Sequence, residues 1–174
     1  IYRFIPSDLR PTTAYRLKVG KGLSSAADGV LKDEFGWAFT TISPAVDAIA
    51  PGDNTQFAAP DQKVVVTFNQ PMERSSSAVN VRNHESGARV PGTISWSDDG
   101  RAATFTPAVR LGVDQVYIAT VAKGLKGARG GETTVERSSS FRTVGTPRVI
   151  RTEPRSGATD AGRFGVNLMF AHPM

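Results

Sequence analysis

VVVTFNQPM, residues 64–72, is the stretch that decides the fold, because the chain closes on a second version of it, VNLMFAHPM at residues 166–174. The two stretches match in register, with an offset of 174 − 72 = 102 residues. Residues two apart in a β-strand share a face, so Val64, Val66 and Phe68 form one apolar face. Positions 166, 168 and 170 keep that face apolar while the residues between them change. The repeat therefore preserves a buried strand face, and we interpret residues 64–72 as the second strand of a domain and its exit.

A second sequence repeat links the start of the chain to its later half. Phe4-Ile5-Pro6 resembles Phe105-Thr106-Pro107, and after a one-residue length difference the two segments match at an offset of 102. These matches include Tyr15 with Tyr117, Val19 with Val121, Gly29 with Gly131 and Phe39 with Phe141. Short solenoid repeats have periods of about 20 to 50 residues, so this period indicates an array of whole small domains.

The register of the repeats predicts the domain organisation. One complete unit covers residues 44–144, residues 1–43 are the C-terminal strands of a preceding unit, and residues 145–174 are the N-terminal strands of a following one. Both flanking units are incomplete, so we expect the chain to be a piece of a longer array. Each flank should leave strands unpaired and an apolar face uncovered.

The complete unit has the pattern of an all-β, immunoglobulin-like β-sandwich, with short strands between turns and no helical periodicity over three turns. We expect strands at about residues 46–50, 62–69, 78–83, 92–97, 102–106, 115–122 and 138–143. The predicted structural core consists of inward-facing apolar residues, namely Val64, Val66, Phe68, Met72, Trp96, Phe105, Tyr117 and Phe141.

The segment TISWSDDGRAATF, residues 93–105, predicts a hairpin in which Asp99-Gly100 supplies the positive backbone angles of the turn and Trp96 points inward. A calcium loop or a paired-carboxylate site at Asp98 and Asp99 is the alternative. Adjacent turn residues point in different directions, and no further acidic ligands follow at EF-hand spacing. The pattern favours the turn.

Tyr15 opens an alternating segment, Tyr15-Arg16-Leu17-Lys18-Val19, that is typical of the tyrosine corner of Ig-like and fibronectin-type sandwiches. In that motif the phenol ring packs inside and its hydroxyl bonds to backbone upstream. Tyr117 stands at the equivalent place in the complete unit. Both tyrosines are therefore predicted to be structural.

No residue pattern predicts a catalytic, cofactor-binding or metal site, and we expect no cofactor. Gly20-Lys21-Gly22 lacks the Ser or Thr that a phosphate-binding loop places directly after its lysine. His84 and His172 have no metal-ligand spacing, and the runs at residues 75–77 and 138–140 lack a nucleophile elbow around their serines. The chain has no cysteine, which excludes disulfides and thiolate chemistry.

Composition excludes two further classes of partner. The net charge is +5, but the 21 Lys and Arg residues are spread along the chain without interleaved aromatics, so we predict no nucleic-acid binding. No run approaches the roughly 18 to 20 apolar residues of a membrane span, and the first residues lack the order of a signal peptide. We therefore expect no membrane insertion of this segment.

The strand ending VTFNQPM, the hairpin ISWSDDGRAATFTP, the following Leu-to-Tyr strand and the closing SSSFRT together resemble bacterial Ig-like domains of S-layer proteins and bacterial alpha-2-macroglobulins. The spacing of Trp96-Ser-Asp-Asp-Gly100 and Phe105-Thr-Pro107 is most similar to the macroglobulin arrays. That family traps proteases through a bait region and a Cys–Gln thioester. The resemblance implies that these domains are scaffold, because this chain has no cysteine and no segment that reads as bait.

The resemblance predicts a non-catalytic structural array, extracellular or periplasmic and associated with the cell envelope, in which proteases are partners only of the parent protein. Two alternatives stay open, namely a cell-surface adhesion or S-layer spacer and an accessory module of an extracellular polysaccharide-degrading enzyme. The expected partners are neighbouring Ig-like domains. Strand exchange with a second copy through the incomplete flanks is a further hypothesis.

Overall fold

A computed structural model describes residues 3–75, 77–159, 162 and 165–171. Every regular element within these residues is a β-strand, which confirms the all-β prediction. The strands are β1 (Ala14–Val19), β2 (Phe35–Thr40), β3 (Val46–Ala50), β4 (Thr55–Ala58), β5 (Val64–Phe68), β6 (Asn80–Asn83), β7 (Gly92–Trp96), β8 (Ala102–Pro107), β9 (Val116–Val121), β10 (Arg137–Thr143), β11 (Val149–Glu153) and β12 (Asn167–Phe170).

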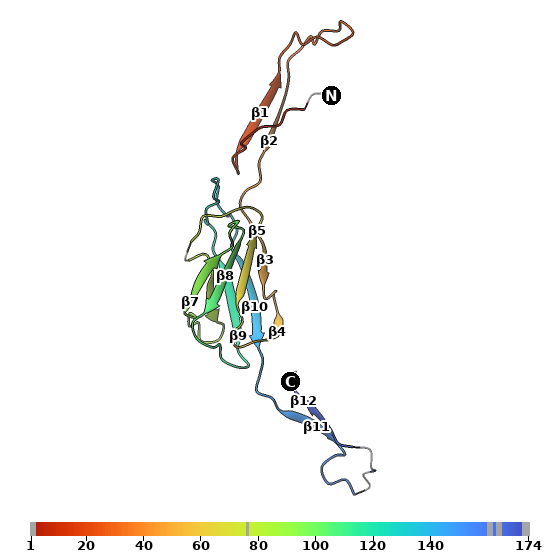
Figure 1. Cartoon of the computed structure of the whole chain (residues 1–174), viewed down its shortest axis with the longest axis vertical. Coiled ribbons are helices and arrows are strands. Elements are labelled where there is room, and N and C mark those ends of the chain that lie inside the picture. Colours follow the sequence, from red (N-terminus) through yellow and green to blue (C-terminus); the bar gives the residue numbers. More distant parts are fainter. Residues whose placement is uncertain (1–2, 76, 160–161, 163–164, 172–174) are drawn as a thin grey trace.

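Two four-stranded sheets make a β-sandwich in the middle of the chain (Figure 1). One sheet has the order β3-β5-β8-β7 and the other β4-β10-β9-β6. The β-strands of the first sheet pair antiparallel, whereas β4 joins the second sheet parallel to β10. The strand order brings β5 and β9 into the interior of their sheets, which matches their alternation of buried and less buried residues.

The core lies between the sheets and is made by the inward faces of their strands. Seven of the eight predicted core residues are at least 95% buried, namely Val64, Val66, Phe68, Met72, Phe105, Tyr117 and Phe141. Trp96 differs, because it is only partly buried at the margin of the core. Its ring stacks on Phe68 with centroids 5.7 Å apart, and its Nε1–H donates to the Ser75 carbonyl oxygen at 3.1 Å. An indole at the margin can both pack and satisfy its N–H.

The sequence pattern missed strand β4, so the interpretation of residues 64–72 as the second strand was wrong. VVVTF is β5, the third strand of the central unit. β4 has four residues and no alternating burial, and Phe57 within it takes a positive φ of 61°. Its partner β10 lies more than 80 residues later, where Phe141 is opposite Thr55. A short strand defined by such a distant partner has little local signal.

Two hairpins flank the sandwich and lie at its opposite ends (Figure 1). In β1–β2, Tyr15 is opposite Phe39, as Tyr117 is opposite Phe141 in β9–β10. In β11–β12, Leu168 is opposite Thr152, which corresponds to Val66 opposite Ile49 in β3–β5. The hairpins therefore have the strand pairing of the closing and opening strands of the central unit. That each belongs to a further domain of a longer chain, as the boundaries at 43 and 145 imply, stays a prediction.

The offset between the central strands and the β11–β12 hairpin is not constant, a difference beyond the one-residue change that the sequence shows near the start of the chain. Phe170 minus Phe68 gives 102, but their opposite residues, Val149 and Val46, differ by 103. The connection between β11 and β12 is accordingly one residue shorter than that between β3 and β5. The predicted matches at His172 and Met174 lie outside the described residues.

Candidate functional site

The turn at residues 97–101 is built by Asp99, and its geometry confirms the turn interpretation. The Asp99 Oδ1 accepts hydrogen bonds from the Ser97 hydroxyl at 2.6 Å and from the Arg101 N–H at 3.0 Å. These bonds, the Ser97 hydroxyl first, hold the pKa of Asp99 below its usual value. Only Gly100 of the predicted pair takes a positive φ, 68°. Among the described residues, no group of three or more His, Asp or Glu side chains is placed to hold a metal ion.

Ser140 makes a polar contact that the sequence pattern did not reveal. Its hydroxyl and its N–H donate to Asp53 Oδ1 at 2.7 and 2.9 Å, and its hydroxyl accepts from the Asn54 N–H at 3.3 Å. The Ser140 hydroxyl bond is the main cause of a lowered pKa at Asp53. The hydrogen bonds between Asp53 and Ser140 hold the loop before β4 against β10.

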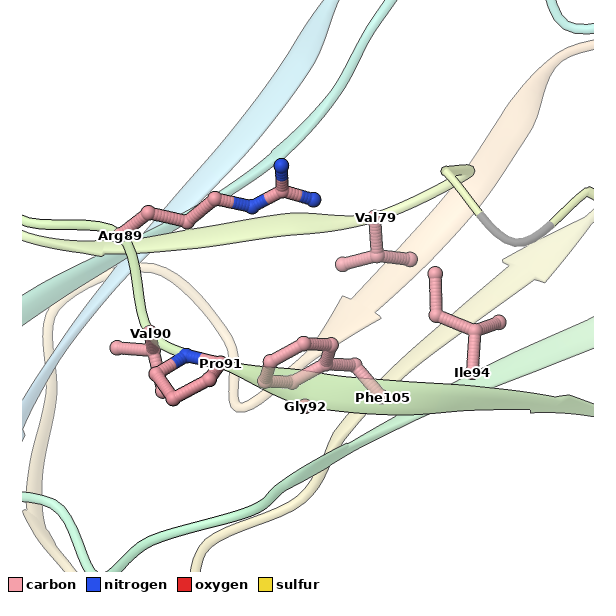
Figure 2. A pocket seen from close by; sticks show the side chains of 7 residues that line it. All are labelled: Val79, Arg89, Val90, Pro91, Gly92, Ile94 and Phe105. Carbon is pink, nitrogen blue, oxygen red and sulfur yellow. The ribbon is translucent and has the colours of Figure 1, made fainter.

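A hollow of about 350 Å³ lies beside β7 (Figure 2). Its lining is Val79, Arg89, Val90, Pro91, Gly92, Ile94 and Phe105. Figure 2 shows the Phe105 ring beside Gly92, where a Cβ would come within 2.4 Å of the ring. Arg89 brings the only charge among these seven residues, and none of them is an acid or a nucleophile. The hollow therefore lacks the groups for acid–base or covalent chemistry.

The tyrosine corner occurs twice, as the sequence predicts. The Tyr117 hydroxyl accepts from the Gly112 N–H at 2.8 Å and donates to Gln115 Oε1 at 2.9 Å. The Tyr15 hydroxyl accepts from the Arg10 N–H, also at 2.8 Å. Both tyrosines fix the segment that leads into a strand. The predicted upstream hydrogen bond is present at both tyrosines, whereas only the Tyr117 ring is fully packed inside and Tyr15 is partly buried.

A further polar site is the junction between the β1–β2 hairpin and the sandwich, and it is organised by the exit of β5. Asn69 Nδ2 donates to the Ser43 carbonyl oxygen at 2.9 Å, and Asn69 Oδ1 accepts from the Ala45 N–H at 3.0 Å. The Asn69 N–H also donates to the Ala45 carbonyl oxygen at 3.1 Å. Residues 41–45 form the linker between β2 and β3, and Pro44 within this linker is fully buried. One side chain thus fixes both sides of the linker.

The same exit holds a loop of the β9–β10 connection, residues 126–131, against the linker. The Ala128 N–H donates to the Pro71 carbonyl oxygen and the Glu73 N–H to the Lys126 carbonyl oxygen, both at 2.9 Å. A Cβ at Gly127 or at Gly131 would come within 3.0 Å of Pro44. The absence of side chains at these two positions lets the loop pack on the linker proline.

Gly131 also reaches the preceding hairpin. A Cβ at Gly131 would lie 2.6 Å from the Thr12 Oγ1. Thr12 itself is tied to the linker, because its hydroxyl donates to the Ser43 hydroxyl at 3.1 Å and its N–H donates to the Ile42 carbonyl oxygen at 3.2 Å. The hairpin, the linker and the sandwich therefore meet at one contact.

The second junction, between the sandwich and β11–β12, keeps only part of this arrangement. The Ala171 N–H donates to the Arg148 carbonyl oxygen at 2.8 Å, as the Asn69 N–H does to Ala45. Alanine has no amide side chain, so the two side-chain bonds of Asn69 have no counterpart there. In the sequence repeat Ala171 stands where Asn69 does, but the alternation of the strand gives no sign that the asparagine holds a linker.

Comparison with known proteins bears on the fold of the central unit. A model of the bacterial Ig-like domain matches residues 42–143. CopC from Methylosinus trichosporium OB3b is 18% identical, with 59% of this chain and 95% of that chain covered and a TM-score of 0.49. No curated protein matches the chain.

Two further solved structures are similar to the chain. The N-terminal part of the bacterial S-layer protein SbsC is 21% identical, with 64% of this chain and 26% of that chain covered and a TM-score of 0.44. Escherichia coli alpha-2-macroglobulin, spanning domains MG0-NIE-MG1, is 19% identical, with 62% and 34% covered and a TM-score of 0.45. This chain thus spans about a quarter to a third of those two structures. The domain model covers more than half of the chain, from the linker to the last residue of β10, and the chain belongs to the bacterial Ig-like domain family.

Proposed function

We propose that this chain is a non-catalytic structural array, in which Ig-like units are held end to end as part of a large secreted or envelope-associated protein. The observation that carries the proposal is the junction at Asn69, which bonds to both sides of the linker at 2.9 and 3.0 Å. A linker whose proline is buried and whose flanking backbone groups are bonded restricts the angle between units. A spacer needs such a joint, whereas an enzyme needs a reactive cleft.

The chemistry of the described residues agrees with this proposal. The Asp53–Ser140 and Asp99–Ser97 pairs close loops, and the hollow beside β7 is apolar except for Arg89. No helix in the described part of the chain is long and apolar enough to span a bilayer. We propose an extracellular or periplasmic location, which rests on the family and on the sequence resemblance.

For the parent protein, we favour a bacterial alpha-2-macroglobulin-like protease trap, because of the similarity in residues 96–107. Its proteases would contact other parts of the parent. The test is to isolate the full-length parent and treat it with methylamine, which opens a thioester. Incorporation of methylamine with loss of protease capture would support the trap. A parent without a reactive Cys–Gln pair would contradict it and favour a surface-layer spacer.

The array itself is tested by the angle between units. Small-angle scattering of the 174-residue chain should give an elongated particle with a narrow distribution of shapes at the Asn69 junction. Replacing residues 42–45 with Gly-Ser residues should broaden that distribution, since Gly-Ser linkers are flexible. If the two chains scatter alike, the linker contacts do not fix the angle and the proposal of a held array fails.

A further inference from the structure

Strand β7 forms an edge of the sandwich and is regular and uncharged along its whole length. Natural proteins keep sheet edges from pairing with other chains by bulges, charged side chains or covering loops. β7 has the sequence GTISW, without a charge, and it pairs with β8 along its whole length without a register shift. Gly92, Thr93 and Ser95 are exposed. β7 is therefore an edge that another strand can extend.

The other three edges of the two sheets are protected. β3 carries Asp47, and its pairing with β5 has a register shift. β4 has only four residues, and its pairing with β10 also shifts register. The outer edge of β6 is covered by the loop that follows it, because the Val90 N–H donates to the Val81 carbonyl oxygen at 2.8 Å. β7 thus differs from every other edge of the sandwich.

The hydrogen-bond pattern shows which backbone groups of β7 face outward. The Ser97 N–H donates to the Ala102 carbonyl oxygen at 2.9 Å, on the β8 side. Bonded residues alternate along an antiparallel pair, so the backbone groups of Gly92, Ile94 and Trp96 point away from β8. In the described part of the chain, no group bonds to the backbone of these three residues on that side. Their N–H and C=O groups are free to pair.

We propose that β7 pairs antiparallel with β7 of a second copy, about a two-fold axis at Ile94, and joins two sandwiches side by side through one continuous sheet. Only an axis at the middle outward-facing residue lets all three pair, because Gly92 then lies opposite Trp96 of the second copy. The contact is isologous and closes at two copies. Figure 1 places β7 on the side of the sandwich, between the ends where the hairpins lie, so the contact leaves end-to-end joining of units unobstructed.

The side chains on the inner face of β7 fit this register. Gly92 and Ile94 line the hollow beside β7 (Figure 2). The two-fold axis places the Trp96 indole of the second copy opposite Gly92, where an aromatic ring covers the backbone that an edge glycine leaves exposed. Trp96 is only partly buried within one copy, so part of its ring surface is available for this contact.

The two ends of the strand carry complementary charges. Arg89 precedes Ile94 by five residues and Asp98 follows it by four, so the pairing brings Arg89 of each copy to Asp98 of the other. Both residues are exposed, and neither side chain has an ion-pair or hydrogen-bond partner among the described residues. Asp99, by contrast, is already bonded within its turn. The register therefore gives two unpaired opposite charges a partner at each end.

The first test is the mass of the 174-residue chain by sedimentation velocity over a range of concentrations. We expect a dimer to form from the 18.6 kDa monomer as concentration rises. Thr93→Lys/Ser95→Lys should weaken the dimer more than about tenfold, because the axis places the introduced lysines of the two copies directly opposite each other.

Asp47→Lys is the matched control for the double-lysine variant. It changes the net charge by the same amount, but on β3, at the other edge of the same sheet. This control should dimerise like the wild type. A wild-type chain that stays monomeric at several hundred micromolar would overturn the proposal, and so would a double-lysine variant that dimerises like the wild type.

Thr93→Glu/Ser95→Lys tests the position of the axis. With the axis at Ile94, each introduced glutamate lies opposite an introduced lysine, so this variant should dimerise at least as strongly as the wild type. An axis at Thr93 or at Ser95 would place like charges opposite each other. Loss of the dimer in this variant would therefore contradict the pairing. Urea unfolding of the sandwich should stay close to that of the wild type, because both substituted positions are exposed.

Arg89→Glu and Asp98→Lys test the charges at the ends of the strand. Each variant alone brings like charges together at both ends and should weaken the dimer about three- to tenfold. An equimolar mixture of the two variants should regain the wild-type dimer, because the mixed pair has opposite charges at both ends. A mixture that dimerises no better than the single variants would show that these charges do not meet between copies.

A fluorescence measurement reports the contact at Gly92 directly. The chain has two tryptophans, so Trp37→Phe leaves Trp96 as the sole indole. Its emission should shift to shorter wavelength as concentration rises, with the same midpoint as the change in mass. Association without that shift would place the contact elsewhere and refute the proposal. A monomeric chain would leave the Asn69 junction intact, so this failure is distinguishable from failure of the proposed array.

Discussion

Asn69 donates a hydrogen bond from its side chain to the carbonyl oxygen of Ser43, 26 residues earlier in the chain, at 2.9 Å. The bond joins the exit of β5 to the linker that precedes β3. The repeated motif at residues 64–72 therefore has two parts with different roles. Its valines and Phe68 fill the core, while the polar exit holds the segment that connects the β1–β2 hairpin to β3.

Asn69→Ala should loosen this junction and lower the free energy of unfolding of the sandwich by about 1–2 kcal/mol, because two hydrogen bonds are lost. The most direct measurement is hydrogen exchange at the Ala45 N–H, which donates to Asn69 Oδ1 and should exchange at least about tenfold faster, since 1.4 kcal/mol is a factor of ten. Asn80→Ala, at an exposed position of β6, is the control. Unchanged exchange at Ala45 would contradict the role assigned to Asn69.

Gly131→Ala should cost more stability than Gly130→Ala. Both glycines have positive φ, 73° and 96°, so each substitution should cost roughly 1 kcal/mol in backbone strain. Only Gly131 is crowded, because its Cβ would lie 2.6 Å from Thr12 Oγ1, whereas nothing lies within 4 Å at Gly130. Urea unfolding should therefore separate the two variants, and NMR shifts at Thr12 should change only for Gly131→Ala. Equal losses of stability in the two variants would mean that the contact between Gly131 and Thr12 does not contribute to the free energy of unfolding.

Tyr117→Phe should destabilise the sandwich by about 1–2 kcal/mol, because the Gly112 N–H loses its acceptor in a partly buried site. Tyr15→Phe is the natural comparison, since it removes the equivalent bond to the Arg10 N–H. The β1–β2 hairpin is a separate sheet, so this second substitution should leave the unfolding midpoint of the sandwich unchanged. A similar loss in both variants would indicate that hairpin and sandwich unfold as one unit.

Ser140→Ala should raise the pKa of Asp53 towards its ordinary value of 3.8, because the Ser140 hydroxyl is the main cause of the lowered pKa. A depressed pKa in the folded state stabilises the fold above the ordinary pKa, and this stability is lost as the pH falls through the folded value. As the pH falls from 5 to below the pKa of Asp53 in the folded wild type, the free energy of unfolding should therefore decrease more in the wild type than in Ser140→Ala. Carboxyl NMR titration and acid unfolding measure this, with the exposed Ser138→Ala as control. Parallel pH profiles would exclude a contribution from the bond.

Much of the fold was predictable because its signals are local or repeated. The alternation at Val64, Val66 and Phe68 placed these residues in the core, and the Tyr15 and Tyr117 segments predicted their corner bonds. The burial of Trp96 was only partly predicted. Alternation predicts the face of the strand on which a side chain lies, but it does not predict how deeply that side chain is buried at the end of the strand. Strand β4 was missed because its partner in β10 is remote in sequence.

The polar contacts were not predictable for the same reason. Asp53 bonds to Ser140, 87 residues away, and Asn69 bonds across 26 residues to the linker. Neither residue has a local pattern that distinguishes it from other polar residues of loops. Their roles follow from the packing of segments that meet only after the sheets form.

The sequence by itself determined the strand faces, the tyrosine corners and the repeat, because each depends on periodicity within a strand or on a match between segments. Tertiary structure alone decided which polar groups close the junction and where strand β4 pairs. Those outcomes depend on distances between remote segments, and hydrogen bonds and burial are set by such distances rather than by residue type.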